Sequence, residues 1–121
     1  MVGWFEIPVT DMNRAVKFYE KVFSISISLN DLGEFKMGWF PFDAAKSGAP
    51  GSLVQNSNYI PSDTKGPLLY FSCKDLSDEL SHITAAGGTV LQEKTEIGGG
   101  HGFMALFIDS EGNRIALHSQ I

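Results

Sequence analysis

Three side chains that suit proton transfer fall at alternating positions of predicted strands: Glu6, Tyr70 and His118. Period-two alternation places each of them opposite the most apolar residues of its strand, so all three are expected to face one cavity. A carboxylate, a phenol and an imidazole around a bound molecule can move protons, which makes them the candidate catalytic set. The alternative is a structural Glu6–His118 pair that closes the floor of a pocket, because buried charges need partners.

A further histidine lies in the glycine-rich segment at residues 98–102, where His101 is the one residue with a side chain. Glycine allows this loop many backbone conformations, so His101 is a candidate ligand-binding residue on a lid over the pocket. The alternative is a solvated loop histidine, and the glycines lack the spacing of a nucleotide-binding loop. Cys73 is expected to be an inert core thiol.

The elements that must position these residues follow from apolar periodicity. Alternation predicts strands at residues 5–9, 26–29, 35–40, 52–55, 67–73, 90–97, 103–109 and 113–118. Helical spacing predicts a helix over residues 12–23 with Asp11 as its N-cap. A second helix is expected after Asp75, with a core stripe at Leu76, Leu80 and Ile83 and its end at Gly87.

The pattern of the first half returns in the second half, displaced by the 64 residues that separate Asp11 from Asp75. Each half reads strand-helix-strand-strand-strand, and a polar connector at residues 56–66 separates them. We therefore predict one domain over residues 1–121, with module one at about 1–57 and module two at about 66–121. A half of this size buries too little surface alone, so the modules share a core, or the chain dimerises, or both.

Composition excludes several classes of partner. The formal net charge is −5 and no run of Lys or Arg is present, which argues against nucleic-acid binding. No apolar run approaches the roughly 20 residues of a membrane span. The first residues lack the basic start of a signal peptide, and the single cysteine excludes an internal disulfide, so a cytoplasmic location is the default expectation.

Two segments carry a resemblance to a known family. Residues 5–12 precede a helix with Ala15, Phe18 and Tyr19, and Asp109-Ser110-Glu111-Gly112-Asn113 precedes the last strand. Together with the repeat, this resembles the vicinal oxygen chelate superfamily, which includes glyoxalase I, bleomycin-resistance proteins, fosfomycin-resistance enzymes and extradiol dioxygenases. The resemblance implies an α+β fold of two βαβββ modules, with a curved mixed sheet around a cleft, and a homodimer.

In metal-dependent members the resemblance implies ligands at four strand positions, which here are Trp4, Ser52, Leu68 and Ala116. Indole, isobutyl and methyl groups offer a divalent metal no donor, and a serine hydroxyl is a poor neutral ligand. We therefore predict no cofactor and no metal at the usual site. A displaced metal site built from Glu6, His118 and a third donor stays open as an alternative.

Strand parity also predicts what lines the cavity beside the candidate catalytic set: Trp4, Ser52, Val54, Leu68, Ser72 and Ala116. The opposite face is expected to pack on the helices: Phe5, Ile7, Val9, Leu69, Phe71, Cys73, Ile115 and Leu117. A mostly apolar cavity with a few polar groups is typical of small-molecule sites. Our hypothesis is a small-molecule-binding protein without the usual metal site.

Two alternatives stay open. One is an enzyme, a glyoxalase-like lyase or isomerase that uses a displaced metal or a Glu6/His118 proton shuttle. The other is a structural or regulatory module whose pocket is filled by its own Trp4 and Leu68. The sequence does not indicate the ligand, nor whether the modules pair within a chain or between chains.

Overall fold

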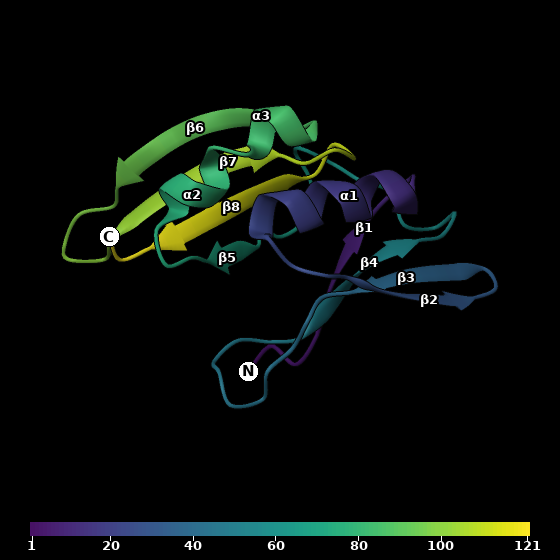
Figure 1. Cartoon of the computed structure of the whole chain (residues 1–121). Helices are drawn as coiled ribbons and strands as arrows, with labels where there is room; N and C mark the ends of the chain where they lie inside the picture. Colours follow the sequence, from purple (N-terminus) through teal and green to yellow (C-terminus); the bar gives the residue numbers. More distant parts are fainter.

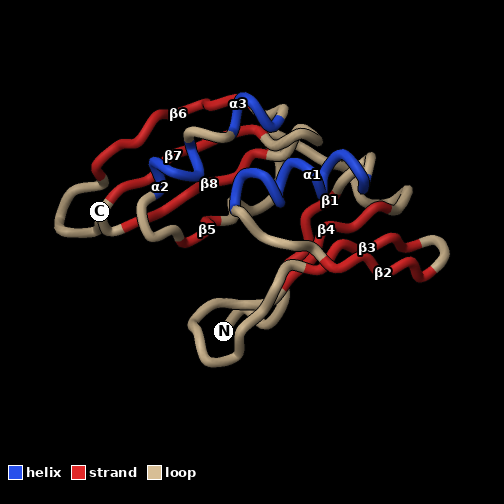
Figure 2. Tube along the Cα trace, in the orientation of Figure 1, coloured by secondary structure: helices blue, strands red, loops and turns tan.

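Each half of the chain folds into its own four-stranded mixed sheet, in a computed structural model that describes all of residues 1–121 (Figures 1 and 2). Module one contains β1 (Phe5–Pro8), α1 (Met12–Phe23), β2 (Ser28–Leu32), β3 (Phe35–Trp39) and β4 (Gly51–Gln55), with strand order β1-β4-β3-β2. Module two contains β5 (Tyr70–Ser72), α2 (Leu76–Leu80), α3 (Ile83–Ala86), β6 (Thr89–Glu96), β7 (Phe103–Ile108) and β8 (Arg114–Ser119), with strand order β5-β8-β7-β6. The predicted α+β fold of two modules is confirmed.

The sequence repeat is preserved in the strand register. β1 lies parallel to β4 with Glu6 opposite Ser52, and β5 lies parallel to β8 with Tyr70 opposite Ala116. Each residue of the second pair is 64 positions after its counterpart in the first. The helix starts repeat as well, because Asp11 accepts a hydrogen bond from the Arg14 N–H and Asp75 accepts one from the Ser77 N–H.

The α1 helix occupies the residues that its apolar stripe predicts, and it packs on β3 and β4 while touching α2 and α3 (Figure 1). The helices α2 and α3 cover one face of the second sheet: α2 contacts β6, β7 and β8, and α3 contacts β6. The core between these layers contains residues from both modules: Ile7, Val9, Met12, Ala15, Phe18, Tyr19, Val22, Ile27, Leu53, Leu76, Ile83, Ala105, Phe107, Ile115 and Leu117. Of the residues predicted to pack on the helices, Ile7, Val9, Ile115 and Leu117 lie in this core, and Phe5, Leu69, Phe71 and Cys73 pack against it.

Three predicted elements differ from the structure. The helix expected after Asp75 is broken, because α2 ends at Leu80 and α3 begins at Ile83. The Ser81 hydroxyl donates a 2.7 Å hydrogen bond to the backbone oxygen of Asp78, and such a bond competes with helix continuation. α3 then ends at Gly87, whose φ of 105° is in the left-handed region.

The strand expected at residues 26–29 begins only at Ser28 and continues to Leu32. Ile27 is buried, and its N–H donates to Glu20 Oε2 at 2.8 Å, which keeps this residue in the core and out of the ladder. The turn between β2 and β3 includes Gly33, whose φ of 84° is in the left-handed region. The strand expected at residues 67–73 shrinks to Tyr70–Ser72, since Pro67 has no N–H for a ladder.

A carboxylate from module two ties the modules together at the start of α1. Glu111 Oε1 accepts hydrogen bonds from the N–H groups of Thr10 and Asp11 at 2.9 and 2.8 Å. Its Oε2 accepts one from Arg14 Nε at 2.7 Å, and the Glu111 side chain is fully buried. The turn at residues 109–113 therefore holds the second sheet against the first helix. None of the three helices has the length and apolarity that a membrane span requires.

Candidate functional site

The face of the first sheet opposite α1 carries a group of aromatic side chains around one carboxylate. Glu6 on β1, Ser52 on β4 and Trp39 on β3 are register partners in one row across the sheet. Trp4 leans along this row: its ring centroid is 5.8 Å from that of Trp39, edge to face, and its Nε1 is 3.3 Å from Glu6 Oε2. Tyr59 donates its hydroxyl to Glu6 Oε1 at 2.8 Å. We call Trp4, Glu6, Trp39 and Tyr59 the aromatic corner.

Beneath the aromatic corner lies a hydroxyl without a partner. Ser52 is fully buried, and its Oγ makes no hydrogen bond. Trp4 reaches both residues that flank Ser52 in the row, Glu6 and Trp39, and so bridges over it. Most buried polar atoms in proteins are bonded, and an exception calls for an explanation. Val54, predicted with Ser52 to contact a ligand, is also fully buried.

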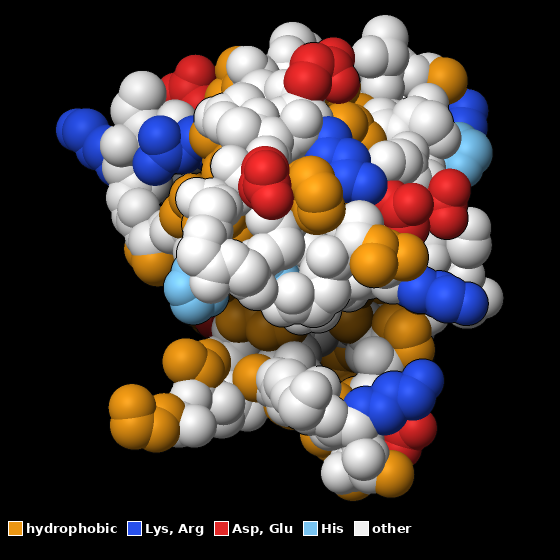
Figure 3. Space-filling model, turned by 90° about the vertical axis from the view of Figure 1, so that its left-hand side faces the viewer, with side chains coloured by type: hydrophobic (Ala, Val, Ile, Leu, Met, Phe, Trp, Pro, Cys, Tyr) orange, Lys and Arg blue, Asp and Glu red, His pale blue; other side chains and the backbone are white.

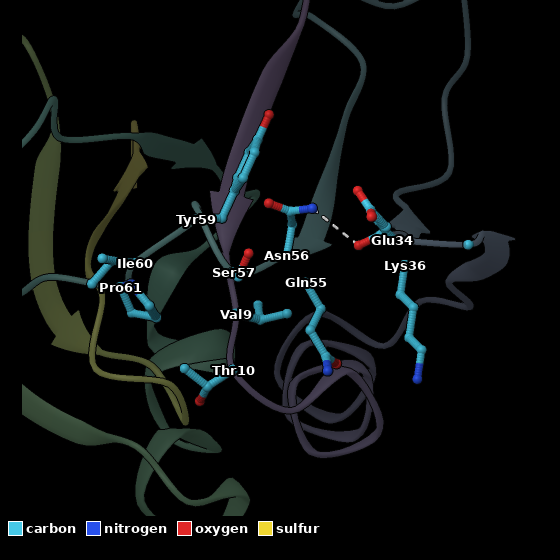
Figure 4. A pocket seen from close by; sticks show the side chains of 11 residues that line it. Val9, Thr10, Glu34, Lys36, Gln55, Asn56, Ser57, Tyr59, Ile60 and Pro61 are labelled. Atoms are coloured by element: carbon cyan, nitrogen blue, oxygen red, sulfur yellow. Dashed lines mark hydrogen bonds between the residues drawn. The ribbon is translucent and has the colours of Figure 1, made fainter.

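Tyr59 and Trp39 are absent from the residues that sequence reasoning singled out. Tyr59 comes from the polar connector, where no periodicity indicates an inward side chain. Figure 4 shows it alongside β1, with its hydroxyl pointing away from Val9 and Thr10, and its ring packs edge to face on Phe35. Strand parity could have identified Trp39, because it lies two residues after Met37 on a predicted strand and therefore shares a face with it.

The aromatic corner borders a cleft of about 520 Å³ that runs between β1, the connector and the start of β8. Glu6 and Pro8 line it from β1 and Trp4 lines it from just before that strand, while Lys65 and Arg114 line it from the connector and β8. The volume falls in the range of small-molecule sites. A smaller and more polar groove of about 380 Å³, which includes Gln55 and Asn56, lies on the far side of the connector (Figure 4).

A neighbouring pocket of about 480 Å³ is mostly apolar and shares Val2, Phe5 and Leu69 with the cleft. It lies between the N-terminal segment, the loop before β4 and strand β5, and it includes the predicted site residues Tyr70 and Ser72. Figure 1 shows the N-terminus and that loop projecting together from the body. Figure 3 shows the molecule hollowed above this projection, with apolar side chains gathered at the hollow.

The structure gives Glu6 and His118 separate partners. The Nε2 atom of His118 lies 2.7 Å from the backbone oxygen of His101, at the other end of its sheet from the connector. Because a carbonyl only accepts, this contact requires a proton on Nε2. Glu6 is instead bonded by Trp4 and Tyr59. The predicted Glu6–His118 contact is therefore not formed in the chain.

The remaining candidate residues are spread over the second sheet. Tyr70 and Ser72 are exposed on β5, and Ala116 is fully buried on β8 between them and β7. Leu68 is partly buried just before β5. His101 is exposed, and its contribution to His118 is a backbone oxygen and not its imidazole.

The side chains at the four inherited ligand positions do not fit a divalent metal. Trp4, Leu68 and Ala116 offer no donor, and the hydroxyl of Ser52 lies buried under the aromatic corner. No group of three or more His, Cys, Asp or Glu side chains converges anywhere in the structure. Glu6 and His118, the basis of the displaced alternative, are each bonded elsewhere.

The chain is similar to several known proteins. A "Glyoxylase-like domain-containing protein" of Didymella fabae is 27% identical over 96% of this chain and 91% of its own length. A hypothetical protein from S. aureus superposes with a TM-score of 0.74 at 19% identity, over 98% of this chain and 93% of that one. The trypanothione-dependent glyoxalase I of Leishmania major superposes with a TM-score of 0.73 at 18% identity, over 97% and 84%.

Glyoxalase I from Zea mays gives a TM-score of 0.73 at 17% identity over 97% of this chain, which spans only 45% of the maize chain. At sequence identities of 17–19%, the structural similarity to these three proteins shows that the chain shares their fold. The family model of the Glyoxalase/Bleomycin resistance protein/Dioxygenase superfamily matches residues 1–117. The chain, with its two βαβββ modules, belongs to the glyoxalase/bleomycin resistance protein/dioxygenase superfamily.

Proposed function

We propose that the chain binds a small organic molecule in the cleft beside the aromatic corner, and that it does so without the four-ligand metal site of metal-dependent relatives. One observation carries the proposal: the four inherited ligand positions hold Trp4, Ser52, Leu68 and Ala116. Aromatic side chains around a few polar groups bind organic ligands well, but they provide no donor atom that could coordinate a divalent metal.

The cleft supports this proposal through its volume and its lining. At about 520 Å³ it has room for a molecule of metabolite or drug size. Phe5 and Leu69 supply apolar contact area, and Glu6 and Arg114 supply charges that can orient a ligand. Tyr70 and Ser72 extend the same surface into the adjoining pocket.

We also propose that two copies associate, with residues 1–121 of each forming one domain of two modules. Exposed apolar side chains at the end of β2 and the start of β3 include Leu32 and Phe35, which are register partners, and a second copy would cover them. A cytoplasmic location stays a prediction from the single Cys73.

The test combines metal analysis with a ligand screen. Protein purified from its host without chelator is expected to carry less than stoichiometric zinc, nickel, iron or manganese. Apolar and aromatic small molecules are expected to raise its melting temperature, and Lys65→Trp, which narrows the cleft at an exposed position of its lining, is expected to weaken that effect. A stoichiometric metal whose removal abolishes ligand binding would overturn the proposal.

The enzyme alternative, a lyase or isomerase with a Glu6/His118 shuttle or a displaced metal, has weaker support. A shuttle needs both groups within reach of one substrate, and the two side chains have different partners at different places in the fold. Turnover that survives chelation but is lost in both Glu6→Gln and His118→Ala would favour the enzyme over a binding protein.

A further inference from the structure

The Glu6 carboxylate lies on an aromatic surface and has no ion-pair partner in the chain. Its two hydrogen-bond donors, the Tyr59 hydroxyl and the Trp4 indole N–H, are both neutral. The two ion pairs of the chain, Arg14–Glu111 and Lys94–Asp75, lie elsewhere. The donors thus fix the orientation of the carboxylate without neutralising it, and Glu6 itself is exposed.

Two indoles stand beside this charge at nearly a right angle. The planes of Trp4 and Trp39 meet at 77°, and the residues are 41% and 44% exposed. The face of an indole carries partial negative charge and attracts cations more strongly than that of any other side chain. Exposed indole faces next to a carboxylate without an ion-pair partner therefore favour the binding of a cation.

The floor of the corner offers a polar atom as well. The Ser52 Oγ is buried without a partner, between Glu6 and Trp39 in the row. Trp4 lies outside the ladder, before β1 begins, and a 3.3 Å hydrogen bond and one edge-to-face contact hold its ring.

The positive side chains of the cleft lie toward its other end. Lys65 and Arg114 are tied through their backbone N–H groups to Ser62, at 2.9 and 3.3 Å. Asn113, next to Arg114, donates to the backbone oxygen of Pro8. Pro8 is two residues beyond Glu6 along β1, and Trp4 is two residues before it, so the backbone at Asn113 and Arg114 and that at Trp4 lie on opposite sides of Glu6, and neither Lys65 nor Arg114 forms an ion pair with the Glu6 carboxylate.

We propose that the aromatic corner binds the alkylammonium group of a ligand, a quaternary ammonium or a protonated amine. The cation sits against the indoles of Trp4 and Trp39, with the Glu6 carboxylate as its counter-charge. This inference rests on the proposed function, since it names the chemical class of the molecule that the cleft takes.

The experiment uses the two tryptophans as reporters, because Trp4 and Trp39 are the only ones in the chain. The intact protein is titrated with choline and with its neutral carbon isostere, 3,3-dimethylbutan-1-ol, while tryptophan emission is followed and calorimetry measures the same affinities. Choline is expected to change the emission and to bind about ten-fold more tightly than the isostere. Glu6→Gln and Trp39→Phe are expected to remove most of this preference, and Glu96→Gln, which removes an exposed carboxylate of module two, is expected to keep it.

Circular dichroism first establishes that each variant is folded. Equal affinity for choline and the isostere overturns the cation inference but leaves small-molecule binding in place. If other compounds bind in the thermal screen but choline does not, the cation inference is likewise overturned and small-molecule binding stays in place. Failure of every compound overturns both proposals. Self-association that shields both indoles from a soluble quencher, with no choline response, shows that a second copy occupies the corner and also overturns the inference.

Discussion

The phenol of Tyr19 donates a 2.6 Å hydrogen bond to Oδ2 of Asp109, which joins the helix of module one to the turn before the last strand of module two. Both residues are buried. The other oxygen of Asp109 accepts from the N–H groups of Glu111 and Asn113 at 2.8 and 2.9 Å. The turn that marks the family in the sequence is therefore a joint between the modules, shaped by Asp109 and fixed by Tyr19.

Tyr19→Phe is expected to destabilise the protein by about 1–3 kcal/mol, because it leaves a buried carboxylate oxygen short of a donor. Chemical denaturation, followed by circular dichroism, measures the free energy of unfolding. Tyr70→Phe is the matched control: this phenol is 52% exposed, and its removal is expected to change stability by about 0.5 kcal/mol at most. Equal effects of the two substitutions would contradict the role of the joint.

Acid is expected to weaken the joint through Glu111. Burial raises the pKa of its carboxyl, but the hydrogen bonds that it accepts, led by that from Arg14, outweigh burial and lower the pKa to about 2 from an ordinary 4.5. A group whose pKa is lower in the folded state adds stability above its unfolded pKa and loses it as the pH falls toward its folded pKa. The loss therefore falls between pH 4.5 and about 2.

After allowance for the solvent around the half-exposed Arg14, this contribution is about 1–2 kcal/mol. Denaturation midpoints at pH 7, 4 and 3 measure it. Glu111→Gln is expected to lower stability at pH 7 and to flatten the acid dependence, whereas Glu96→Gln keeps the dependence of the parent. An acid profile that is unchanged in Glu111→Gln would refute the assignment.

Helix caps and apolar periodicity predicted most of the fold, because both patterns occur in each of the two modules. Asp11 and Asp75 both cap helices, and the apolar alternation of β1 and β4 returns in β5 and β8 with the same register. Where tertiary contacts compete with local preference, prediction failed. Ile27 has a strand pattern, yet its burial and its bond to Glu20 remove it from β2.

Less of the candidate site could be predicted from the sequence. Strand parity predicts on which face of the sheet a side chain lies, but it does not predict which other side chains cover that face. It placed Ser52, Val54 and Ala116 on the face opposite the helices, but it could not show that other side chains bury them completely. It also could not place Tyr59, which reaches Glu6 across 53 residues of sequence from a connector without periodicity. The separate partners of Glu6 and His118 depend on such loop contacts.

His118 is expected to fix the glycine-rich loop through the backbone oxygen of His101. The contact requires the proton to be on Nε2, because the backbone oxygen of His101 can only accept. His118→Ala is expected to speed amide hydrogen exchange and proteolysis in residues 98–102 several-fold, with little change in the core. His82→Ala, at an exposed histidine on the helix side, serves as control. Nitrogen NMR that shows the parent ring protonated only on Nδ1 would contradict this contact.

Cys73 is expected to resist alkylation. Burial, followed by the nearby Glu79 carboxylate, raises the pKa of its thiol from 9.0 to about 12, and its Sγ lies 3.6 Å from the backbone oxygen of Phe71. At pH 8 this leaves on the order of a thousand-fold less thiolate than a free cysteine has, and the thiolate is the reactive species.

Because Cys73 is the only cysteine, iodoacetamide labelling followed by mass spectrometry reports on this site alone. The native protein is expected to react at least a hundred-fold more slowly than the denatured chain, and Glu79→Gln is expected to speed the reaction while Asp78→Asn leaves it unchanged. Similar rates in the native and denatured protein would show that the thiol is neither shielded nor held in its protonated form.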